Sequence, residues 1–581
     1  MQWIEQRAEQ DLIARLQKDI GISALLARLL VQKGFTDPQK ARSFLQPKLR
    51  DLNDPFAIQN MDLAISKILH VQDSQQSVLL LGDYDVDGIS STVMTKQALE
   101  AIGLVVETII PKRLSEGYGL TQEALERGLS KGKFGLVIAL DCGTNSLEEA
   151  DYLHNQGIDL IVVDHHQQKG DSLPNAILIN PHLSPDQGEP WRNLCTAGLC
   201  FKLIHALYKR LREMDTPGSE VLTPRDFLPL CAIGTLADLV PLQGESRILS
   251  RFGMMRLFVD ASPGLLALLN ECGIEESNAP ETEDITFKLA PRVNACGRLN
   301  EPETAVSLLL EKHSGRCRSL AQKLTQFNEE RKGIEAQLTI DALAQAEEKF
   351  RDSPAVIVTG EGEAWHPGVV GIVAGKLANS LNKPCLVLAH GEGDEYCGSG
   401  RSVPGVNLVE ILSRCQDRLT HWGGHPVAVG LGLKESERDP FIAEFIEAVQ
   451  NCLISTTEES ALSVDAFIGP DELRYELLDE INSLGPFGQG NEEPFLGMKE
   501  IVLDSPVRPI GNGEHFQFSI RNAYGYIRGV AWRMGDQRPP VGQKIDLLFK
   551  LRKNFWNGRS SLQLVLEDWK LSVLSQTNNL D

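Results

Sequence analysis

The sequence predicts an α/β protein of several domains that ends in a small β-domain, and three observations lead to this fold class. Apolar runs alternate with helical segments from about residue 77, which is typical of a parallel sheet covered on both faces. Residues 317–350 contain no Pro and one Gly, so we expect one long helix there. Short alternating stretches dominate from about 460 to 570. A chain of 581 residues is also too long for one hydrophobic core.

The N-terminal segment, residues 1–70, is expected to be helical. Apolar positions at helical spacing, separated by Gly, Asp and Pro stops, recur in 22–34, 37–45 and 61–72. The first α/β domain is expected over 71–305. Its strand candidates are near-continuous apolar runs at 77–82, 105–110, 136–141, 159–166 and 176–180.

The second half of the chain begins with a connecting segment, residues 306–351, that holds the long helix. A second α/β domain is expected over 352–452, with apolar strand candidates at 355–360 and 384–390. The C-terminal domain, 453–581, has the short alternating stretches of an antiparallel barrel or sandwich. These stretches are 514–522, 524–532, 544–552 and 560–569.

Composition and charge restrict the possible functions. No segment approaches the roughly 20 uninterrupted apolar residues of a membrane helix, and the charged N-terminus lacks the apolar core of a secretory signal. The 11 cysteines include no C-x-x-C pair, so we expect reduced thiols in a cytoplasmic protein. The net charge of −22 argues against a polyanionic partner, but residues 501–570 hold eleven Lys and Arg against six Asp and Glu. Any nucleic-acid binding must therefore be local.

The stretch GDYDVDG, residues 82–88, places Asp83, Asp85 and Asp87 on alternate positions after an apolar run. It matches the opening of a calcium-binding loop, which also requires a Glu at position twelve and a preceding helix. Position twelve is Met94, and the preceding residues have the pattern of a buried strand, so this interpretation fails. An acidic turn at a strand end and an enzymatic metal site remain.

Polar residues recur after two further strand candidates, which favours the metal site. Asp141 follows one apolar run, and Asp164, His165 and His166 follow the next. Ligands of open α/β sheets bind beyond the carboxyl ends of the strands, where these side chains would meet. Carboxylates held so close together repel unless cations compensate. Mixed carboxylate and imidazole ligands suit Mn²⁺ or Mg²⁺, and we expect a pair of ions.

Asp238 lies in GTLADLVPL, an otherwise apolar helical stretch where an uncompensated charge is costly. One interpretation is an aspartate at a helix end that pairs with an arginine. The other is a further ligand of the same metal centre.

The motifs as a set resemble a known family. Four stretches resemble the four motifs of the DHH phosphoesterase superfamily: GDYDVDG, LDCG, VVDHH and GTLADLVPL. Two later segments resemble those of RecJ-type single-strand exonucleases: PRVNACGRLNEP and NEERKGIEAQ. Three further segments resemble the second, DHH-associated lobe of these enzymes: WHPGVVGIVAGKL, GSGRSVPGVNL and GGHPVAVGL. The resemblance implies a DHH-type parallel-sheet lobe and a DHH-associated α/β lobe, joined by the long helix around a central cleft. It also implies a C-terminal OB-fold β-barrel, entered at SLGPFGQGNEEPFL.

The resemblance also implies roles for individual residues. Asp164 would orient an imidazole, His166 would contact the scissile phosphate, and Asp83 would be either a ligand or a hydrogen-bond acceptor beside the metal. The implied metal ligands are Asp85, Asp87, Asp141, His165 and Asp238.

Arginines are expected to contact substrate phosphates. Arg298 would stabilise the transition state, unless it is a structural arginine bonded to backbone carbonyls. Ser399 and Arg401 of GSGRS would hold a 5′ end with Arg113 opposite, unless GSGRS is an ordinary glycine-rich turn. His425 would either contact a phosphate or pack in the core.

The basic C-terminal stretch contains Lys553 and Trp556, among aromatic and charged residues that could hold a single strand. The alternative is a set of core aromatics beside a solvated charged face.

The expected function is Mn²⁺- or Mg²⁺-dependent 5′→3′ hydrolysis of single-stranded DNA. Two alternatives are a DHH phosphodiesterase for nanoRNA or cyclic dinucleotides and a non-catalytic Cdc45-like scaffold. The resemblance further implies recombination and mismatch repair, a single-strand-binding protein and a RecQ-type helicase as partners, and a cytoplasmic monomer without membrane association.

Overall fold

The computed structural model describes the chain except for short segments. The described residues are 2–113, 115–215, 221–278, 280–362, 365–391, 393–453, 461–556 and 559–572. They belong to two units, which we describe separately. The larger unit comprises Asp54–Asp238 and Phe252–Glu459, and the smaller one comprises Met1–Asn53, Leu239–Arg251 and Ser460–Asp581. No helix in the described ranges is long and apolar enough to cross a bilayer.

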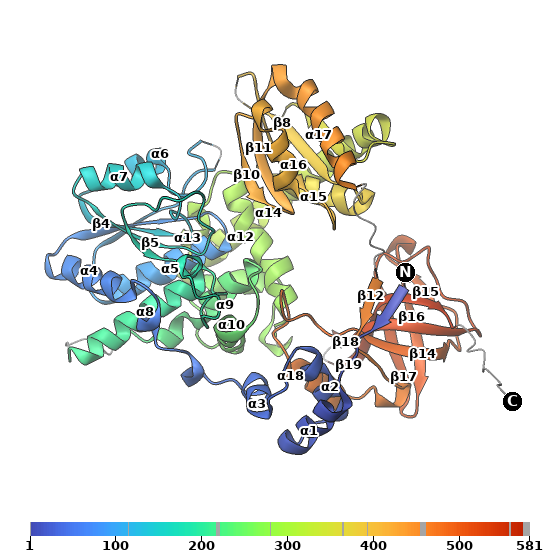
Figure 1. The fold of residues 1–581 in the computed structure, drawn as a ribbon. Coiled ribbons are helices and arrows are strands. Elements are labelled where there is room, and N and C mark those ends of the chain that lie inside the picture. Colours follow the sequence, from blue (N-terminus) through green and yellow to red (C-terminus); the bar gives the residue numbers. More distant parts are fainter. Residues whose placement is uncertain are drawn as a thin grey trace. The chain divides into compact units, whose positions relative to one another are not determined.

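A five-stranded parallel sheet forms the centre of the first lobe of the larger unit (Figure 1). Its spatial order is β3 (Val106–Ile109), β2 (Ser77–Gly82), β4 (Phe134–Leu140), β5 (Asp159–Val163) and β6 (Ile177–Ile179). The helices of the lobe are α4 (Met61–Asp73), α5 (Val86–Ala101), α6 (Gln122–Leu129), α7 (Leu147–Asn155), α8 (Thr196–Glu213), α9 (Leu228–Ala237), α11 (Pro263–Glu271), α12 (Ala290–Arg298) and α13 (Glu303–Leu310).

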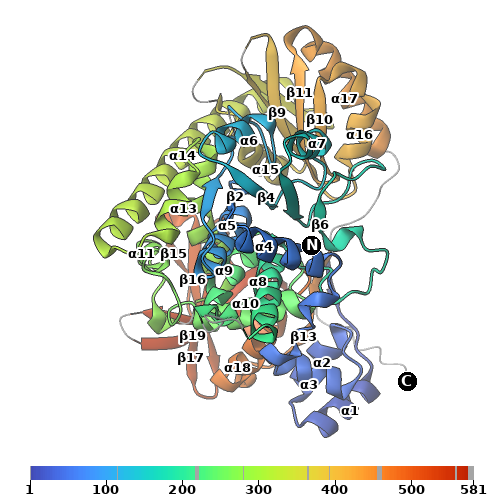
Figure 2. The same cartoon turned by 90° about the vertical axis from the view of Figure 1, so that its left-hand side faces the viewer.

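Helices cover both faces of this sheet, as its continuous apolar strands predict. Leu79 and Leu81 of β2 pack in one cluster with residues of α6 and α7. Leu80 alternates to the opposite face and is also fully buried, and α4 and α5 contact β2 there. Figure 2 shows α6 and α7 on one side of the strands and α4, α5 and α8 on the other. The carboxyl ends of all five strands therefore meet at one edge.

The long helix α14 (Ser314–Lys349) connects the two lobes of the larger unit, which confirms the prediction from its Pro-free sequence. It contacts α11, α12 and α13 of the first lobe, then α15 (Val370–Leu381) and β7 (Val356–Gly360) of the second. Figure 2 shows it running between α11 and α15.

The second lobe contains a mixed five-stranded sheet. Only β7 and β8 (Cys385–His390) are parallel among the described strands of this sheet, and its other pairs are antiparallel. The remaining elements of the lobe are β9 (Glu395–Arg401), β10 (His421–His425), β11 (Ala428–Lys434), α16 (Leu408–Arg414) and α17 (Arg438–Leu453).

The smaller unit brings N-terminal helices together with a C-terminal β-domain. Its sheet has the order β13 (Ala466–Phe467), β14 (Leu496–Val502), β18 (Lys544–Trp556), β19 (Arg559–Leu571), β17 (Gly525–Ala531), β16 (His515–Asn522) and β15 (Arg508–Ile510). Strand β1 (Gln2–Glu5) pairs with β12 (Ala461–Val464). The helices are α1 (Gln10–Ile20), α2 (Ala24–Gln32), α3 (Pro38–Leu45), α18 (Tyr475–Ser483) and the first part of α10 (Gly244–Arg256).

The β-domain closes on itself through one chain segment, residues 496–510. This segment forms β14 against β18 and, after five residues, β15 against β16 at the other end of the sheet. The expected antiparallel barrel or sandwich is corrected at two pairs of strands, because β13 pairs in parallel with β14 and β17 pairs in parallel with β19. The β17–β19 pair needs a long crossover, and β18 lies within it. Short-range strand patterns carry no information on that pairing.

Candidate metal centre

Asp83, Asp141 and Asp164 directly follow neighbouring strands and continue the hydrogen-bonding pattern of the parallel sheet. Each donates its backbone N–H to the carbonyl of the last residue of the adjacent strand, over 3.0 to 3.1 Å. The sheet thereby fixes the backbone from which each carboxylate extends. The three side chains gather at the carboxyl edge, where the strand-end aspartates were expected to meet.

Asp85 and Gly88 build the turn between β2 and α5. Asp85 is the N-cap of α5, and its Oδ1 accepts from the backbone N–H groups of Asp87 at 2.9 Å and of Gly88 at 3.1 Å. A Cβ atom at position 88 would lie 2.5 Å from the carbonyl oxygen of Asp83. Only glycine fits there unless the backbone moves, which explains the glycine that ends GDYDVDG.

The carboxylate of Asp87, which is fully buried, caps a second helix. Its two oxygens accept from the backbone N–H groups of Thr196 and Ala197, each at 2.8 Å. These are the first residues of α8, whose N-cap, Cys195, makes no side-chain capping bond. Asp87 therefore satisfies N–H groups at the positive end of the α8 dipole.

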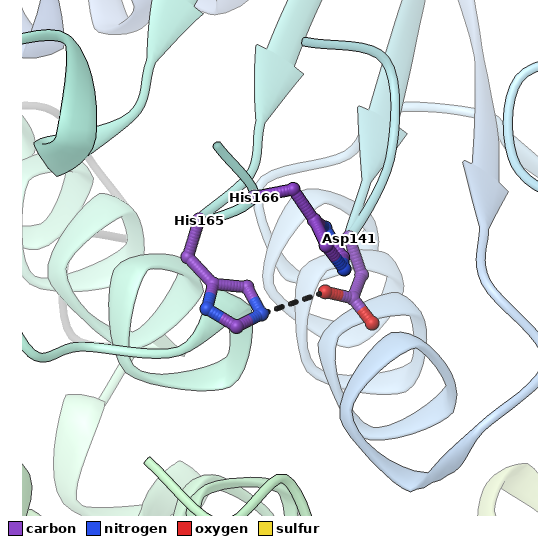
Figure 3. Close-up of side chains that lie close together, drawn as sticks. All are labelled: Asp141, His165 and His166. Atoms are coloured by element: carbon purple, nitrogen blue, oxygen red, sulfur yellow. Dashed lines mark ion pairs between the residues drawn. The ribbon is translucent and has the colours of Figure 1, made fainter. Parts of the chain in front are cut away.

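His165 lies among three carboxylates from three elements. Its Nε2 atom is 3.4 Å from Oδ1 of Asp141, 3.5 Å from Oδ2 of Asp238 and 4.0 Å from Oδ2 of Asp87. Figure 3 shows the His165 ring directed at the Asp141 carboxylate, with His166 beside it. Asp238 is the C-cap of α9. It therefore lies at a helix end and also beside the cluster, so both interpretations of this residue describe its position.

The donor atoms form overlapping groups that fit divalent cations. Asp87, His165 and Asp238 form one group and Asp83, Asp85 and Asp141 another, and within each group the candidate ligand atoms lie within 4.8 Å of one another. A third group consists of Asp141, His165 and His166. Within the described ranges, the buried atoms without a hydrogen-bond partner include Nε2 of His165, Oδ2 of Asp238 and Oδ1 of Asp83. Such atoms are costly to bury unless a cation takes them as ligands.

The electrostatics of the cluster also favour a cation. Burial, reinforced by the charge of Asp85, raises the pKa of Asp83 to about 8 and that of Asp87 to about 7. Burial and neighbouring carboxylates raise the pKa values of Asp141 and Asp238 well above the ordinary range. Burial lowers the pKa of His165 to about 4, so its imidazole stays neutral and able to coordinate.

Asp164 orients His166 rather than His165. Its Oδ1 lies 2.7 Å from Nδ1 of His166 and also accepts the backbone N–H groups of both histidines. Burial alone would favour the uncharged form of both side chains, but the effect of this hydrogen bond is larger. The bond lowers the pKa of Asp164 and raises the pKa of His166 to about 9. His166 is therefore a cation at neutral pH.

Arginines of the larger unit form a positively charged group. Arg113 donates to the hydroxyl of Tyr84 at 2.8 Å, and Arg298 donates to the carbonyl of Gly368 at 2.9 Å. The bond from Arg298 to a backbone carbonyl is the contact expected if this residue is a structural arginine. Burial lowers the pKa values of Arg298 and Arg401, and the charge of Arg113 lowers both further. The three guanidinium groups therefore lie close enough together to repel.

Ser399 and Arg401 share one face of β9. Arg401 donates to Oγ of Ser399 at 2.9 Å, and Ser399 donates to the carbonyl of Val429 at 3.0 Å. A Cβ atom on Gly371, in the first turn of α15, would lie 3.1 Å from Oγ of Ser399 and 3.3 Å from Nη2 of Arg401. The pair thus lies beside a helix N-terminus, a favourable place for a phosphate.

The other sequence-predicted residues lie in different places. His425 ends β10 and is exposed, which excludes the alternative of a core residue, and its charge contributes to the low pKa of His165. Lys553 is exposed on β18, and the side chain of Trp556 lies outside the described residues. Arg552, next to Lys553, is paired with Glu493 at 2.6 Å, so part of the basic stretch is neutralised.

Sequence reasoning missed residues that support the cluster from other elements. The hydroxyl of Thr196 donates to Oδ1 of Asp141 at 2.9 Å, and the side-chain oxygen of Asn294 accepts from the backbone of Val86 at 3.1 Å. Tyr118 packs edge-on against His166. Thr196 lies 55 residues from Asp141, and no spacing rule connects a helix start with a distant strand end.

The fold and site define a protein with a DHH lobe, a DHH-associated lobe and an OB-type barrel, and family comparisons agree. The DHH family, N-terminal domain, matches residues 77–235, the DHHA1 domain matches 353–453, and the RecJ OB domain matches 464–568. This chain belongs to the RecJ family.

Individual relatives match along nearly the whole chain. Single-stranded-DNA-specific exonuclease RecJ of Bacillus subtilis (strain 168) is 35% identical over 98% of this chain and 71% of its own length. The protein of that name from Escherichia coli (strain K12) is 30% identical over 97% of this chain and 98% of its own length. The crystal structure of RecJ in complex with Mn²⁺ from Thermus thermophilus superposes with a TM-score of 0.82 and 26% identity, covering 98% of this chain and 79% of that one.

Proposed function

We propose that this chain is a metal-dependent exonuclease that hydrolyses single-stranded DNA from the 5′ end. The observation that carries the proposal is the buried cluster in which Nε2 of His165 and Oδ2 of Asp238 face each other at 3.5 Å, and neither atom has a hydrogen-bond partner in the part of the chain that the structure describes. The names of the relatives support the substrate, and a solved RecJ structure containing Mn²⁺ supports the metal. Mg²⁺ is the other candidate, since a second Thermus thermophilus RecJ structure contains it.

Two groups of side chains are proposed to hold two cations. Two divalent ions held there would supply the positive charge that activation of a water and stabilisation of the leaving oxygen require. Asp83 joins the second group as a ligand in this proposal, because no described residue forms a hydrogen bond with its buried Oδ1. The proposed groups are Asp87, His165 and Asp238 for one ion and Asp83, Asp85 and Asp141 for the other.

His166 is proposed to donate a hydrogen bond to a non-bridging oxygen of the scissile phosphate. Asp164 keeps its imidazole protonated and fixes its Nδ1, which leaves Nε2 to donate on the other side of the ring. Tyr118 lies 3.5 Å from that Nε2 atom at the exposed side, where a strand would enter. Arg298 adds a second positive charge for the developing phosphorane in this scheme.

A terminal phosphate is proposed to bind at Ser399 and Arg401, with Arg113 contributing from the first lobe. Half-buried guanidinium groups that repel one another gain from an anion between them, and the N-terminus of α15 adds favourable N–H groups. His425 is proposed as a further phosphate contact. Recognition of the terminal phosphate would place the first internucleotide bond at the metals and set the 5′→3′ direction.

The β-domain is proposed to hold the rest of the strand. Lys553 and the neighbouring exposed Phe555 supply charge and a stacking surface, and Trp556 is proposed as a second stacking residue.

We further propose that the protein is a cytoplasmic monomer that acts in recombination and mismatch repair with a single-strand-binding protein and a RecQ-type helicase. Pull-down of the purified partners by the full chain tests that part of the proposal.

End-labelled substrates test the activity. We expect Mn²⁺ or Mg²⁺ to release 5′-terminal mononucleotides from single-stranded DNA, with much slower cleavage of duplex DNA and of RNA, and no cleavage in EDTA. Preferential hydrolysis of dinucleotides or cyclic dinucleotides would favour the short-substrate phosphodiesterase instead. Binding of a single strand without hydrolysis in either metal would favour the non-catalytic scaffold.

A further inference from the structure

Thr196, the first residue of α8, contacts one carboxylate from each of the two proposed cation groups. Its backbone N–H donates to Oδ2 of Asp87 at 2.8 Å, and its hydroxyl donates to Oδ1 of Asp141 at 2.9 Å. All three side chains are buried, and Thr196 itself is fully inaccessible to solvent. A single residue therefore spans the two groups.

The two contacts of Thr196 differ in how they depend on its side chain. The contact to Asp87 uses the peptide N–H and is repeated by Ala197 at 2.8 Å, so it persists whatever side chain stands at position 196. The contact to Asp141 uses the hydroxyl alone. Loss of that hydroxyl would release only the carboxylate of Asp141.

Asp141 has particular need of an orienting donor. Its backbone lies in the left-handed region, with φ of 66°, which non-glycine residues seldom adopt. The carboxylate also faces Nε2 of His165, which has no hydrogen-bond partner among the described residues to hold it in place. Among the described side chains, the hydroxyl of Thr196 is the hydrogen-bond donor to this carboxylate.

We propose that Thr196 is a positioning residue that fixes the carboxylate of Asp141 for its cation, while leaving the cation of Asp87, His165 and Asp238 unaffected. The inference rests on the two-cation centre of the proposed function. Hydrogen-bond partners of metal ligands orient them, and their loss typically weakens metal binding by about 10- to 100-fold. Thr196 would therefore set the affinity of one of two cations selectively.

The test is calorimetric titration of the full-length, metal-free chain with Mn²⁺, with no substrate present. We expect two binding steps in the wild type. In Thr196→Val, which keeps the shape but removes the hydroxyl, one step should weaken by about 10- to 100-fold and the other should stay within about 3-fold. Thr196→Ser restores the hydroxyl and should restore the weakened step. Thr196→Ala serves the same purpose as Thr196→Val if the added methyl group impairs folding.

Thr92→Val is the matched control. Thr92 is also buried, but its hydroxyl donates to the carbonyl of Gly88 at 2.8 Å and not to a carboxylate. Both Mn²⁺ affinities should remain at the wild-type level in this variant. Thermal unfolding in EDTA should give similar midpoints for all folded variants, so that a loss of affinity reports on the site.

Four results would overturn the inference or its basis. Two unchanged affinities in Thr196→Val, or equal weakening of both steps, would contradict the role of Thr196. Failure of Thr196→Ser to recover the weakened step would contradict the hydroxyl as the cause. A wild-type chain that binds no Mn²⁺ would instead contradict the metal centre of the proposed function.

Discussion

Nε2 of His165 lies 3.4 Å from Oδ1 of Asp141, and the two residues follow neighbouring parallel strands. This is too long for a good hydrogen bond, and Nε2 has no other partner in the described part of the chain. Burial keeps the imidazole neutral, so its lone pair is available, and the nearby carboxylates supply negative charge. The arrangement suits ligands of two neighbouring cations better than an ion pair.

Replacement of Arg401 by Ala should impair 5′-phosphorylated substrates most. The guanidinium is proposed to bind the terminal phosphate in a charge-assisted contact, whose loss costs about 1.5–3 kcal/mol, or roughly 10- to 150-fold in kcat/KM. A 5′-hydroxyl strand lacks that contact and should lose much less. Single-turnover assays on the two substrates measure the difference, with Arg414→Ala, an exposed arginine of α16, as control. Equal losses on both substrates would argue against the 5′ pocket.

Replacement of Asp164 by Asn should lower the pKa of His166. The pKa of His166 is raised to about 9, so its protonated form is present at neutral pH and is lost as pH rises through 9. Without the carboxylate, the pKa should move down toward the ordinary value of 6.5. NMR titration of the His166 ring in the metal-free protein measures this shift directly.

The same change should move the alkaline decline of kcat/KM to lower pH in metal-loaded protein. His182→Asn is a suitable control, because the backbone N–H of His182 donates to Asn180 and no hydrogen bond joins its ring to Asp164 within the described residues. An unshifted profile in Asp164→Asn would contradict a protonated His166 as phosphate donor.

Mn²⁺ should stabilise the protein more at pH 8 than at pH 6. The folded, metal-free protein retains protons on Asp83 and Asp87 up to about pH 8 and 7, whereas the unfolded chain releases them near 3.8. The stability that these carboxyl groups contribute without metal is therefore present below about pH 4 and lost as pH rises toward 8. Cations must displace the remaining protons at pH 6 and bind more weakly there.

Thermal unfolding with EDTA or with Mn²⁺ at the two pH values measures this effect. Mn²⁺ at 100 times its Kd should add about 2.7 kcal/mol per site at pH 8. A metal-induced shift in Tm that is equal at both pH values would contradict the protonated state of the cluster.

Replacement of Lys553 by Glu should weaken binding of long single strands and reduce the slope of log K against log salt by roughly one unit. Lys553 is exposed on β18 and is proposed to contact a phosphate. Lys544→Glu on the same strand is the control, because Lys544 is paired with Glu500 at 2.6 Å. Fluorescence anisotropy at several salt concentrations measures both. An unchanged slope would exclude Lys553 from the binding surface.

Much of the architecture could be predicted from the sequence because it depends on local patterns. The apolar run at 77–82 is β2, and the Pro-free stretch at 317–350 is α14 to within three residues. The gathering of strand-end aspartates followed from the rule that parallel strands share one ligand-binding edge.

Long-range contacts could not be predicted. The parallel pair β17–β19 and the pairing of β1 with β12 join segments whose own patterns specify no partner. The sequence around Thr196 is that of an ordinary helix start and gives no sign of a partner. Its bond to Asp141 depends on how α8 packs on the sheet. Local spacing likewise gave no reason to expect a left-handed backbone at Asp141.

Hydrolysis of 5′-labelled single-stranded DNA by Asp141→Ala, measured in Mn²⁺ beside the wild type, tests the central claim most directly. Asp141 is a proposed ligand, and its backbone hydrogen bond to β5 does not depend on its side chain, so the fold should persist. We predict release of labelled mononucleotide by the wild type, none in EDTA, and a loss of more than about 100-fold in a folded Asp141→Ala variant. Near-normal turnover by that variant would contradict the two-cation centre.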